Sequence, residues 1–423
     1  METQLPHFVE VMAAAIFAIA VFHTFSASYF EHLAKAQPAH AGLWHLLGEV
    51  EAVFGFWAMV LLVLIAVQLG TTSSQEYLES RNFTEPAFVF VIMVMAASRP
   101  VIDFAGALLS WLSRLLPLPS AVSYYFVMLS VAPLLGSFIT EPAAMTLAAL
   151  LLRERFMHKN APTRFKYATL GVLFVNISIG GTLTHFAAPP VLMVAETWGW
   201  NTPFMLAHFG WKAAVAVFIN AAVVTYLFRG HLKSISTMSA ALARLDVPVW
   251  VIAVHLMFLA FVVLFNHHPI VFSAFFLFFL GFTEAYKKYQ SRLLIREGLM
   301  VAFFLAGLVV LGGLQKWWLQ PALSGMSPQA LYWGATALTA ITDNAALTYL
   351  GSLVEGVNDE FKFALVAGAV TGGGLTVIAN APNPAGFAIL KGSFDDGAIS
   401  AAGLFSAALL PTLVAAAAFL LLP

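Results

Sequence analysis

The chain of 423 residues has no cysteine and very little charge, since Asp, Glu, Lys and Arg make up only 10% of it. The lack of cysteine excludes disulfides, thiolate metal sites and cysteine nucleophiles. A soluble protein of this size would need roughly a quarter of its residues charged. The composition therefore excludes an ordinary soluble fold. With a net charge of -1 and no Lys/Arg-rich tract, no nucleic-acid partner is expected.

Apolar residues dominate instead, at 61% of the chain, with a mean hydropathy of +0.87. They recur in runs long enough to cross a bilayer as helices, which predicts an all-α polytopic membrane protein. Two further segments, 120–152 and 329–355, are interrupted near their middles and predict re-entrant hairpins. The predicted spans lie near residues 8–29, 43–69, 86–112, 166–198, 208–228, 248–265, 270–286, 298–315, 362–390 and 398–421.

The Lys and Arg residues fall mostly on one side of this arrangement when both termini are placed outside, as the positive-inside rule requires. Arg153, Arg229 and Arg296 belong to the basic loops. The loops at 71–86 and 356–361 lie on the other side and are acidic. We therefore predict a multi-pass protein of the bacterial inner membrane with both termini on the periplasmic side.

Three short patterns of the first half recur in the same order in the second half. "ITEPAAMTL" at 139–147 matches "ITDNAALTY" at 341–349, "FKYA" matches "FKFA", and "GGTLTHFAAPP" at 180–190 matches "GGGLTVIANAPNP" at 372–384. The loop charges give the two copies opposite orientations. This predicts an inverted repeat with five spans and one re-entrant hairpin per half, as in secondary transporters. The halves are residues 1–228 and 248–423, and residues 229–247 form a cytoplasmic connector.

Glycines and prolines in the third pattern predict that segments 166–198 and 362–390 are broken transmembrane helices. The hydroxyl groups of Thr184 and Thr376 and the amides of Asn380 and Asn383 would then meet unwound backbone carbonyls at mid-depth. Such oxygens are hard ligands, which suit a small cation such as Na⁺.

The first pattern places an acid at the tip of each hairpin, in Thr140-Glu141 and in Thr342-Asp343-Asn344. One interpretation is that these acids only cap the helices that follow. A neutral residue would cap as well, however, and a charge at bilayer depth costs about 2.5–3.5 kcal/mol. The recurrence favours a functional role. We predict that Asp343, with Glu141 as its counterpart, holds either a proton or a monovalent cation.

At these residues the chain resembles the ion transporter superfamily, which includes the NhaD sodium/proton antiporters, the arsenite permeases and the sodium-coupled dicarboxylate carriers. "ITDNAALT" resembles their Asp-Asn hairpin motif, and both glycine-rich patterns resemble segments of their broken helices. Glu141-Pro142 and Ala188-Pro189-Pro190 depart from the usual motifs. These departures indicate a divergent branch similar to the putative Na⁺/H⁺ antiporter family. The resemblance implies a homodimer, elevator-type alternating access, and transported Na⁺ and H⁺ with no cofactor.

The alternative function is export or symport of a small anion, arsenite-like or carboxylate, on the same fold, because half-helix N-termini favour anions. Acids at both hairpin tips weigh against it. No enzyme is predicted, since neither His-Glu-x-x-His nor Gly-x-Ser-x-Gly occurs.

Three other polar residues in predicted spans are candidates for secondary roles. His185 adjoins the first break and is a candidate for tuning the response to pH. Arg99 and Asp103 stand four residues apart, which allows a structural ion pair on one helix face. Glu196 and the turn at 267–268 are predicted to be solvated.

Overall fold

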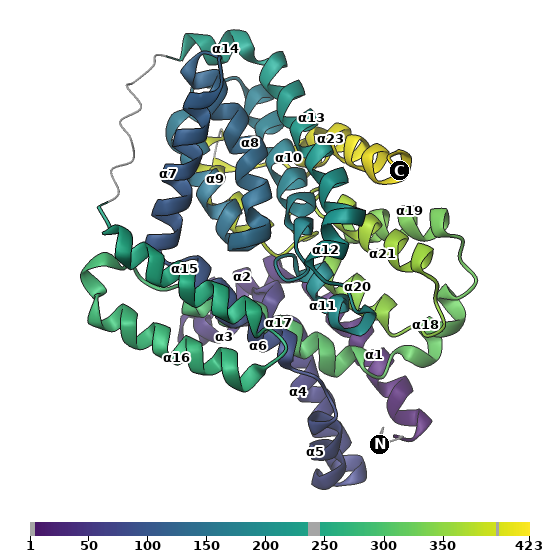
Figure 1. Ribbon diagram of the computed structural model, residues 1–423. Helices are drawn as coiled ribbons and strands as arrows, with labels where there is room; N and C mark the ends of the chain where they lie inside the picture. The colour runs from purple at the N-terminus through teal and green to yellow at the C-terminus, as the bar shows by residue number, and fades with distance from the viewer. Residues whose placement is uncertain (1–4, 236–245, 395–396) are drawn as a thin grey trace.

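A computed structural model describes residues 5–235, 246–394 and 397–423, and every regular element within these ranges is a helix (Figure 1). This agrees with the predicted all-α class. The helices of the first half are α1 (His7–Thr24), α2 (Ala27–Ala36), α3 (Ala41–Gly48), α4 (Val50–Leu69), α5 (Thr71–Glu79), α6 (Thr84–Ala96), α7 (Arg99–Leu115), α8 (Ser120–Ile139), α9 (Glu141–Arg155), α10 (Thr163–Gly180), α11 (Pro189–Trp198), α12 (Thr202–Met205), α13 (Trp211–Leu227) and α14 (Arg229–Ser234).

The second half contributes α15 (Val249–Leu264), α16 (Pro269–Ala285), α17 (Ile295–Gly312), α18 (Lys316–Leu323), α19 (Pro328–Thr339), α20 (Asn344–Ser352), α21 (Asp359–Gly372), α22 (Asn383–Leu390) and α23 (Ala401–Leu421). Short 3₁₀ and π segments join several of them, including η2 (Gly181–Leu183) and η3 (Leu206–Gly210). Much of the predicted connector, residues 236–245, lies outside the described residues.

In the described part of the chain, six helices are long and apolar enough to cross a membrane. They are α1, α4, α8, the continuous α12–α13 stretch, α17 and α23. Ten spans were predicted, and five of them are not in this set. Helices α15 and α16 are only 16 and 17 residues long, and the predicted spans at 86–112, 166–198 and 362–390 are each divided into two helices. The sixth helix of the set, α8, was predicted as one arm of a hairpin. Several apolar helices nevertheless establish a multi-pass membrane protein.

The predicted span at 86–112 is not continuous. Its two helices, α6 and α7, meet at an angle of 66°. Pro100, the second residue of α7, lacks the N–H that would continue the hydrogen bonding of α6, so the chain bends before it. Arg99 therefore lies at this bend and not in the middle of a straight span. If the bent pair crosses as one unit, the number of candidate spans is seven.

The first predicted hairpin consists of α8 and α9, which pack against each other and are joined by Thr140 alone. Thr140 has φ 70° and ψ 150°, and it is the single non-glycine residue with positive φ in the described ranges. This conformation is nearly restricted to glycine and costs about 1–3 kcal/mol. The second pair, α19 and α20, is joined by residues 340–343 without such a conformation.

Both breaks fall where the glycines and prolines predicted them. Helix α10 ends at Gly180 and α11 begins at Pro189, while α21 ends at Gly372 and α22 begins at Asn383. Each break is tied to the α8 or α19 end in its own half. The Thr184 hydroxyl donates to Ser137 O at 2.6 Å, and the Thr376 hydroxyl donates to Ala340 O at 2.9 Å.

The two broken helices also contact each other. Helix α10 packs against α8, α13 and α23, and it crosses α21. At the crossing, the Ser178 hydroxyl donates to Val370 O at 2.7 Å. A Cβ atom on Gly374 would collide with the backbone of Val175, so this close approach requires glycine. Figure 1 shows α15 and α16 as a pair along one side, while α4 and α5 extend away from the α8–α10 region.

Candidate functional site

Glu141, the first residue of α9, is fully buried with 0% of its surface exposed. Its Oε2 accepts a hydrogen bond from Asn380 Nδ2 at 2.9 Å, whereas its Oε1 has no partner. The groups that act on its charge are Asn380 and a second carboxylate, Asp343. No cationic side chain of the described residues pairs with it. A buried carboxylate with one free oxygen and no counter-ion requires a proton or a bound cation.

Glu141 is enclosed by both breaks. On one side lies Gly181 in the first break, where an added Cβ would collide with the Glu141 carboxylate. On the other side lies Asn380 in the second break, between α21 and α22. A Cβ atom at position 181 would therefore force the carboxylate out of its present position. The site brings together residues that are far apart in the sequence.

Several other buried side-chain atoms near the hairpins and breaks have no hydrogen-bond partner. Asn383 Nδ2 donates to Gly373 O at 2.7 Å and to Thr376 O at 2.8 Å, which leaves its Oδ1 free. The unpartnered atoms are Thr140 Oγ1, Thr339 Oγ1, Asn380 Oδ1, Asn383 Oδ1 and both amide atoms of Asn344. Within the described residues no group of three or more His, Asp or Glu side chains suits a metal ion. Hydroxyl and amide oxygens of this kind suit Na⁺ better than a transition metal.

Asp343 has different surroundings. It is the N-cap of α20, and its carboxylate accepts hydrogen bonds from Ala345 N at 2.8 Å and Ala346 N at 3.2 Å. It borders a cavity of about 100 Å³ whose other walls include Phe54 and Phe304. Asp343 lies within electrostatic range of Glu141. The Asp343 charge therefore acts on Glu141, but only Asp343 is satisfied by backbone donors.

The remaining predicted threonines bond to the backbone. Thr342 donates to Leu338 O at 3.0 Å, and Thr184 and Thr376 bond to the hairpins as described above. Asn344 is linked to the second break through its backbone, since its N–H donates to Ala379 O at 3.2 Å. These residues hold the hairpins and the breaks in register.

A cavity of about 760 Å³ leads toward the site. Its walls include Arg296 and Glu49, which form an ion pair at 2.5 Å, and it reaches Thr140, next to Glu141. Glu51, in the first turn of α4, also borders the cavity. The cavity therefore connects a charged rim with the buried carboxylate's immediate neighbour.

Arg99 and Asp103 line the same cavity. The ion pair that their spacing predicted is present, with Arg99 Nε and Asp103 Oδ2 3.2 Å apart, and Asp246 lies 3.8 Å from Arg99 Nη2. Neither residue contacts Glu141.

His185 bonds away from the buried carboxylate. Its Nε2 accepts from Asn266 Nδ2 at 3.1 Å, so its Nδ1 carries the proton and donates to Thr202 Oγ1 at 2.9 Å. These partners belong to the turn between α15 and α16 and to the start of α12. His185 thus anchors the first break to neighbouring segments.

The sequence did not single out Ser137, which joins the first hairpin to the first break. Its hydroxyl donates to Gly180 O at 2.7 Å and accepts from Leu183 N at 2.9 Å. A signal was available, because the matching position in the second half is another hydroxyl residue, Thr339, which is also fully buried.

The sequence was compared with known protein families and with curated proteins. The family described as Putative Na⁺/H⁺ antiporter matches residues 8–422. No curated protein matches significantly. The match extends over both hairpins, both breaks and every residue of the site. The chain therefore belongs to the putative Na⁺/H⁺ antiporter family.

Proposed function

We propose that the protein exchanges a monovalent cation, most readily Na⁺, for protons, and that Glu141 carries both ions in turn. The observation that carries this proposal is a fully buried carboxylate with one unpartnered oxygen and no cationic partner. At bilayer depth such a group is stable when it is protonated or when a cation neutralises it. Because the two states exclude each other, binding of one ion releases the other.

In this proposal the ligands are the free oxygens around Glu141. Thr140 Oγ1 and Asn380 Oδ1 lie on the two segments that contact it, and Asn380 orients the carboxylate. Asp343 adds negative charge close by, which favours a positive ion in the site. Asn344 and Asn383 supply further free amide atoms, while Thr342, Thr184 and Thr376 hold the surrounding backbone.

The ions reach the site through the 760 Å³ cavity, which faces the cytoplasm in this proposal because Arg292 and Arg296 at its rim belong to a predicted inner loop. The conformation is then open to the inside. Both termini lie outside, in a bacterial inner membrane.

The proposal includes the inverted repeat with its two re-entrant hairpins. Contacts that recur in the two halves support it. The Tyr125 and Thr169 hydroxyls bond at 2.7 Å, and those of Tyr332 and Thr371 at 2.8 Å. Helix α11 packs against α20, just as α22 packs against α9. We further propose that the hairpins and breaks move together against the remaining helices, elevator-like, within a homodimer.

Antiport in proteoliposomes tests this function. With a preformed pH gradient, addition of Na⁺, Li⁺ or K⁺ should dissipate the gradient, and Glu141→Gln should reduce the response to the background of empty liposomes. Glu154→Gln, on the exposed end of the same helix, is the matched control and should respond like the wild type. Dissipation by arsenite or a carboxylate, with no response to cations, would instead establish the anion alternative.

A further inference from the structure

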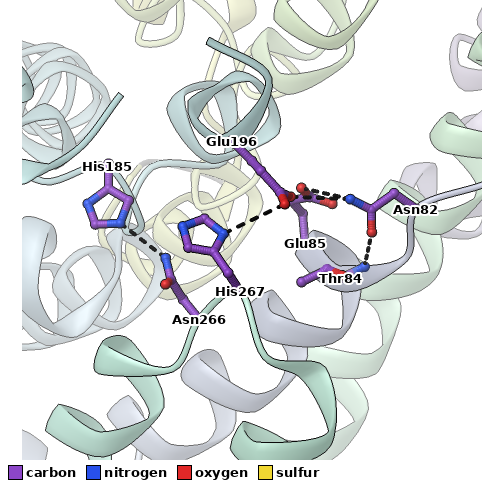
Figure 2. Close-up of polar contacts among 7 residues, drawn as sticks. All are labelled: Asn82, Thr84, Glu85, His185, Glu196, Asn266 and His267. Atoms are coloured by element: carbon purple, nitrogen blue, oxygen red, sulfur yellow. Dashed lines mark hydrogen bonds and ion pairs between the residues drawn. The ribbon is translucent and has the colours of Figure 1, made fainter. Parts of the chain in front are cut away.

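A second group of acids lies away from Glu141, in an outer cluster made of Asn82, Glu85, Glu196, Asn266 and His267 (Figure 2). Glu85 is in the first turn of α6, and Glu196 is near the end of α11. Asn266 and His267 belong to the turn between α15 and α16. The cluster thus joins the first broken helix to two other parts of the molecule.

The contacts in this cluster centre on two carboxyl groups. Asn82 Nδ2 lies 3.2 Å from Glu196 Oε2 and 3.4 Å from Glu85 Oε1, so one amide donates to both acids. The Glu85 and Glu196 carboxyl groups therefore lie close together around this amide. Two carboxylates held this close repel each other when both are ionised. The contact is therefore most stable when the pair holds one proton.

Few charged side chains lie close enough to neutralise the Glu85 and Glu196 carboxylates in place of a proton. His267 Nδ1 lies 3.9 Å from Glu196 Oε1, and both side chains are about half exposed, at 49% and 45%. Tyr349 of α20 is within electrostatic range of Glu85, and Arg81 acts on Tyr349. No Lys or Arg of the described chain forms an ion pair with Glu85 or Glu196. The neutral His185 completes the cluster by accepting from Asn266.

We propose that the Glu85–Glu196 pair is a proton-operated latch, which holds α11 against α6 while its shared proton is present and releases it when the proton leaves. The predicted sidedness places this pair at the outer face, because Glu85 belongs to the acidic 71–86 loop and Asn266 and His267 form an outer turn. The large cavity opens at the other face. The latch therefore keeps the outer side closed, and the pH outside the cell controls it. The latch would regulate the cation exchange proposed above, and its role therefore rests on that proposed function.

Release of α11 is connected to the ion site. Helix α11 packs against α20, which Asp343 caps, and it follows the break in which Thr184 bonds to the first hairpin. Movement of α11 therefore displaces both hairpins. At high outer pH the ionised pair repels, and the outward-open state becomes more populated.

Single-cysteine labelling can measure this opening, because the chain has no cysteine of its own. Ala195, next to Glu196, is 2% exposed and borders the small cavity beside the cluster. In the Ala195→Cys variant, labelling by a membrane-impermeant maleimide should increase as the outer pH rises. Labelling of Thr72→Cys, on the exposed face of α5, corrects for ionisation of the thiol itself. The corrected ratio should rise by up to about tenfold per pH unit, the limit for one linked proton.

Two variants identify the groups that titrate. The Glu85→Gln side chain cannot ionise and so cannot repel Glu196, and the corrected ratio should therefore stay low at every pH. Glu196→Gln should have the same effect, because it removes the other negative charge. Glu79→Gln, an exposed acid on α5, should titrate like the wild type. A flat ratio in the wild-type background, or an unchanged rise in both Gln variants, would overturn the latch. Labelling requires no transport, so loss of cation exchange in liposomes would leave this result intact.

Discussion

The two hairpin junctions begin with the same Ile-Thr-acid pattern but place the acid in different surroundings. Glu141 follows a Thr140 with positive φ, is fully buried, and keeps one carboxylate oxygen without a partner. Asp343 has ordinary N-cap angles, φ −74° and ψ 139°, and bonds to two backbone N–H groups. One copy of the motif therefore fits an ion site, while the other fits a helix cap.

A shift of one residue in the helix start explains the difference. Asp343 is the N-cap of α20, a position from which a short side chain reaches the free N–H groups of the first turn. Glu141 is already the first residue of α9, and Thr140 occupies the N-cap position without making a side-chain cap bond. Pro142 has no N–H to donate. The Glu141 side chain is therefore released from capping and turns to Asn380.

The largest expected effect is a difference in exchange activity between substitutions of Asp343 and of Glu141. Asp343→Asn should keep exchange within about tenfold of the wild type, because Asn caps a helix nearly as well as Asp. Glu141→Gln should abolish exchange in the same proteoliposome assay. If Asp343→Asn abolished exchange and Glu141→Gln did not, the roles of the two acids would be reversed.

Asn380 is the next residue to test, because within the described ranges it supplies the one hydrogen bond to the Glu141 carboxylate. A hydrogen bond to a charged group is worth about 1.5–3 kcal/mol, so Asn380→Leu should weaken apparent Na⁺ affinity by roughly 10–100-fold. Affinity is measured as the Na⁺ concentration that gives half-maximal exchange. Gln75→Leu, an exposed amide on α5, provides the comparison. An unchanged half-maximal concentration in Asn380→Leu would contradict this role.

Gly181→Ala should have a smaller effect on the same quantity. The added methyl would occupy space now filled by the Glu141 carboxylate. Overpacking of this kind costs about 1–3 kcal/mol, so apparent affinity should fall by roughly tenfold. Gly106→Ala is the matched control, since its added Cβ would meet only Leu147 Cδ1 at 3.8 Å. Equal behaviour of the two variants would show that Glu141 does not need this space.

The smallest effect concerns the backbone of the two junctions. Thr140→Gly should raise the free energy of unfolding by about 1 kcal/mol, because glycine adopts φ 70° without strain. Thr342→Gly should lower it by about 0.5–1 kcal/mol, since its φ is not positive and glycine costs more entropy. Thermal unfolding in detergent would compare them. Changes of the same sign in both variants would contradict the strain assigned to Thr140.

Much of the fold follows from local patterns. The apolar runs predicted the helical class, and Gly180-Gly181 and Pro189-Pro190 predicted the first break, because glycine and proline interrupt helical hydrogen bonding whatever surrounds them. The bend before Pro100 came from the same chemistry but was not predicted, because the surrounding run is apolar throughout. Pattern alone also overestimated how many helices have full membrane length.

Only part of the site could be predicted from the sequence. The matched acids pointed to both hairpins, but the Glu141–Asn380 contact joins residues from opposite halves, which no local pattern specifies. The positive φ of Thr140 and the resulting shift in the helix start are tertiary effects. Glu196 was expected to be solvated, and its side chain is about half exposed. Its proximity to Glu85 was not predicted, because it depends on how α11 packs against α6.

Proton release on Na⁺ binding tests most directly whether Glu141 holds one ion at a time. In a weakly buffered detergent solution, adding NaCl to the purified wild-type protein should release about one proton per site, whereas choline chloride should release none. Asp343→Asn should still release the proton, and Glu141→Gln should release none. Proton release that persists in Glu141→Gln would contradict the assignment of the exchange to this carboxylate.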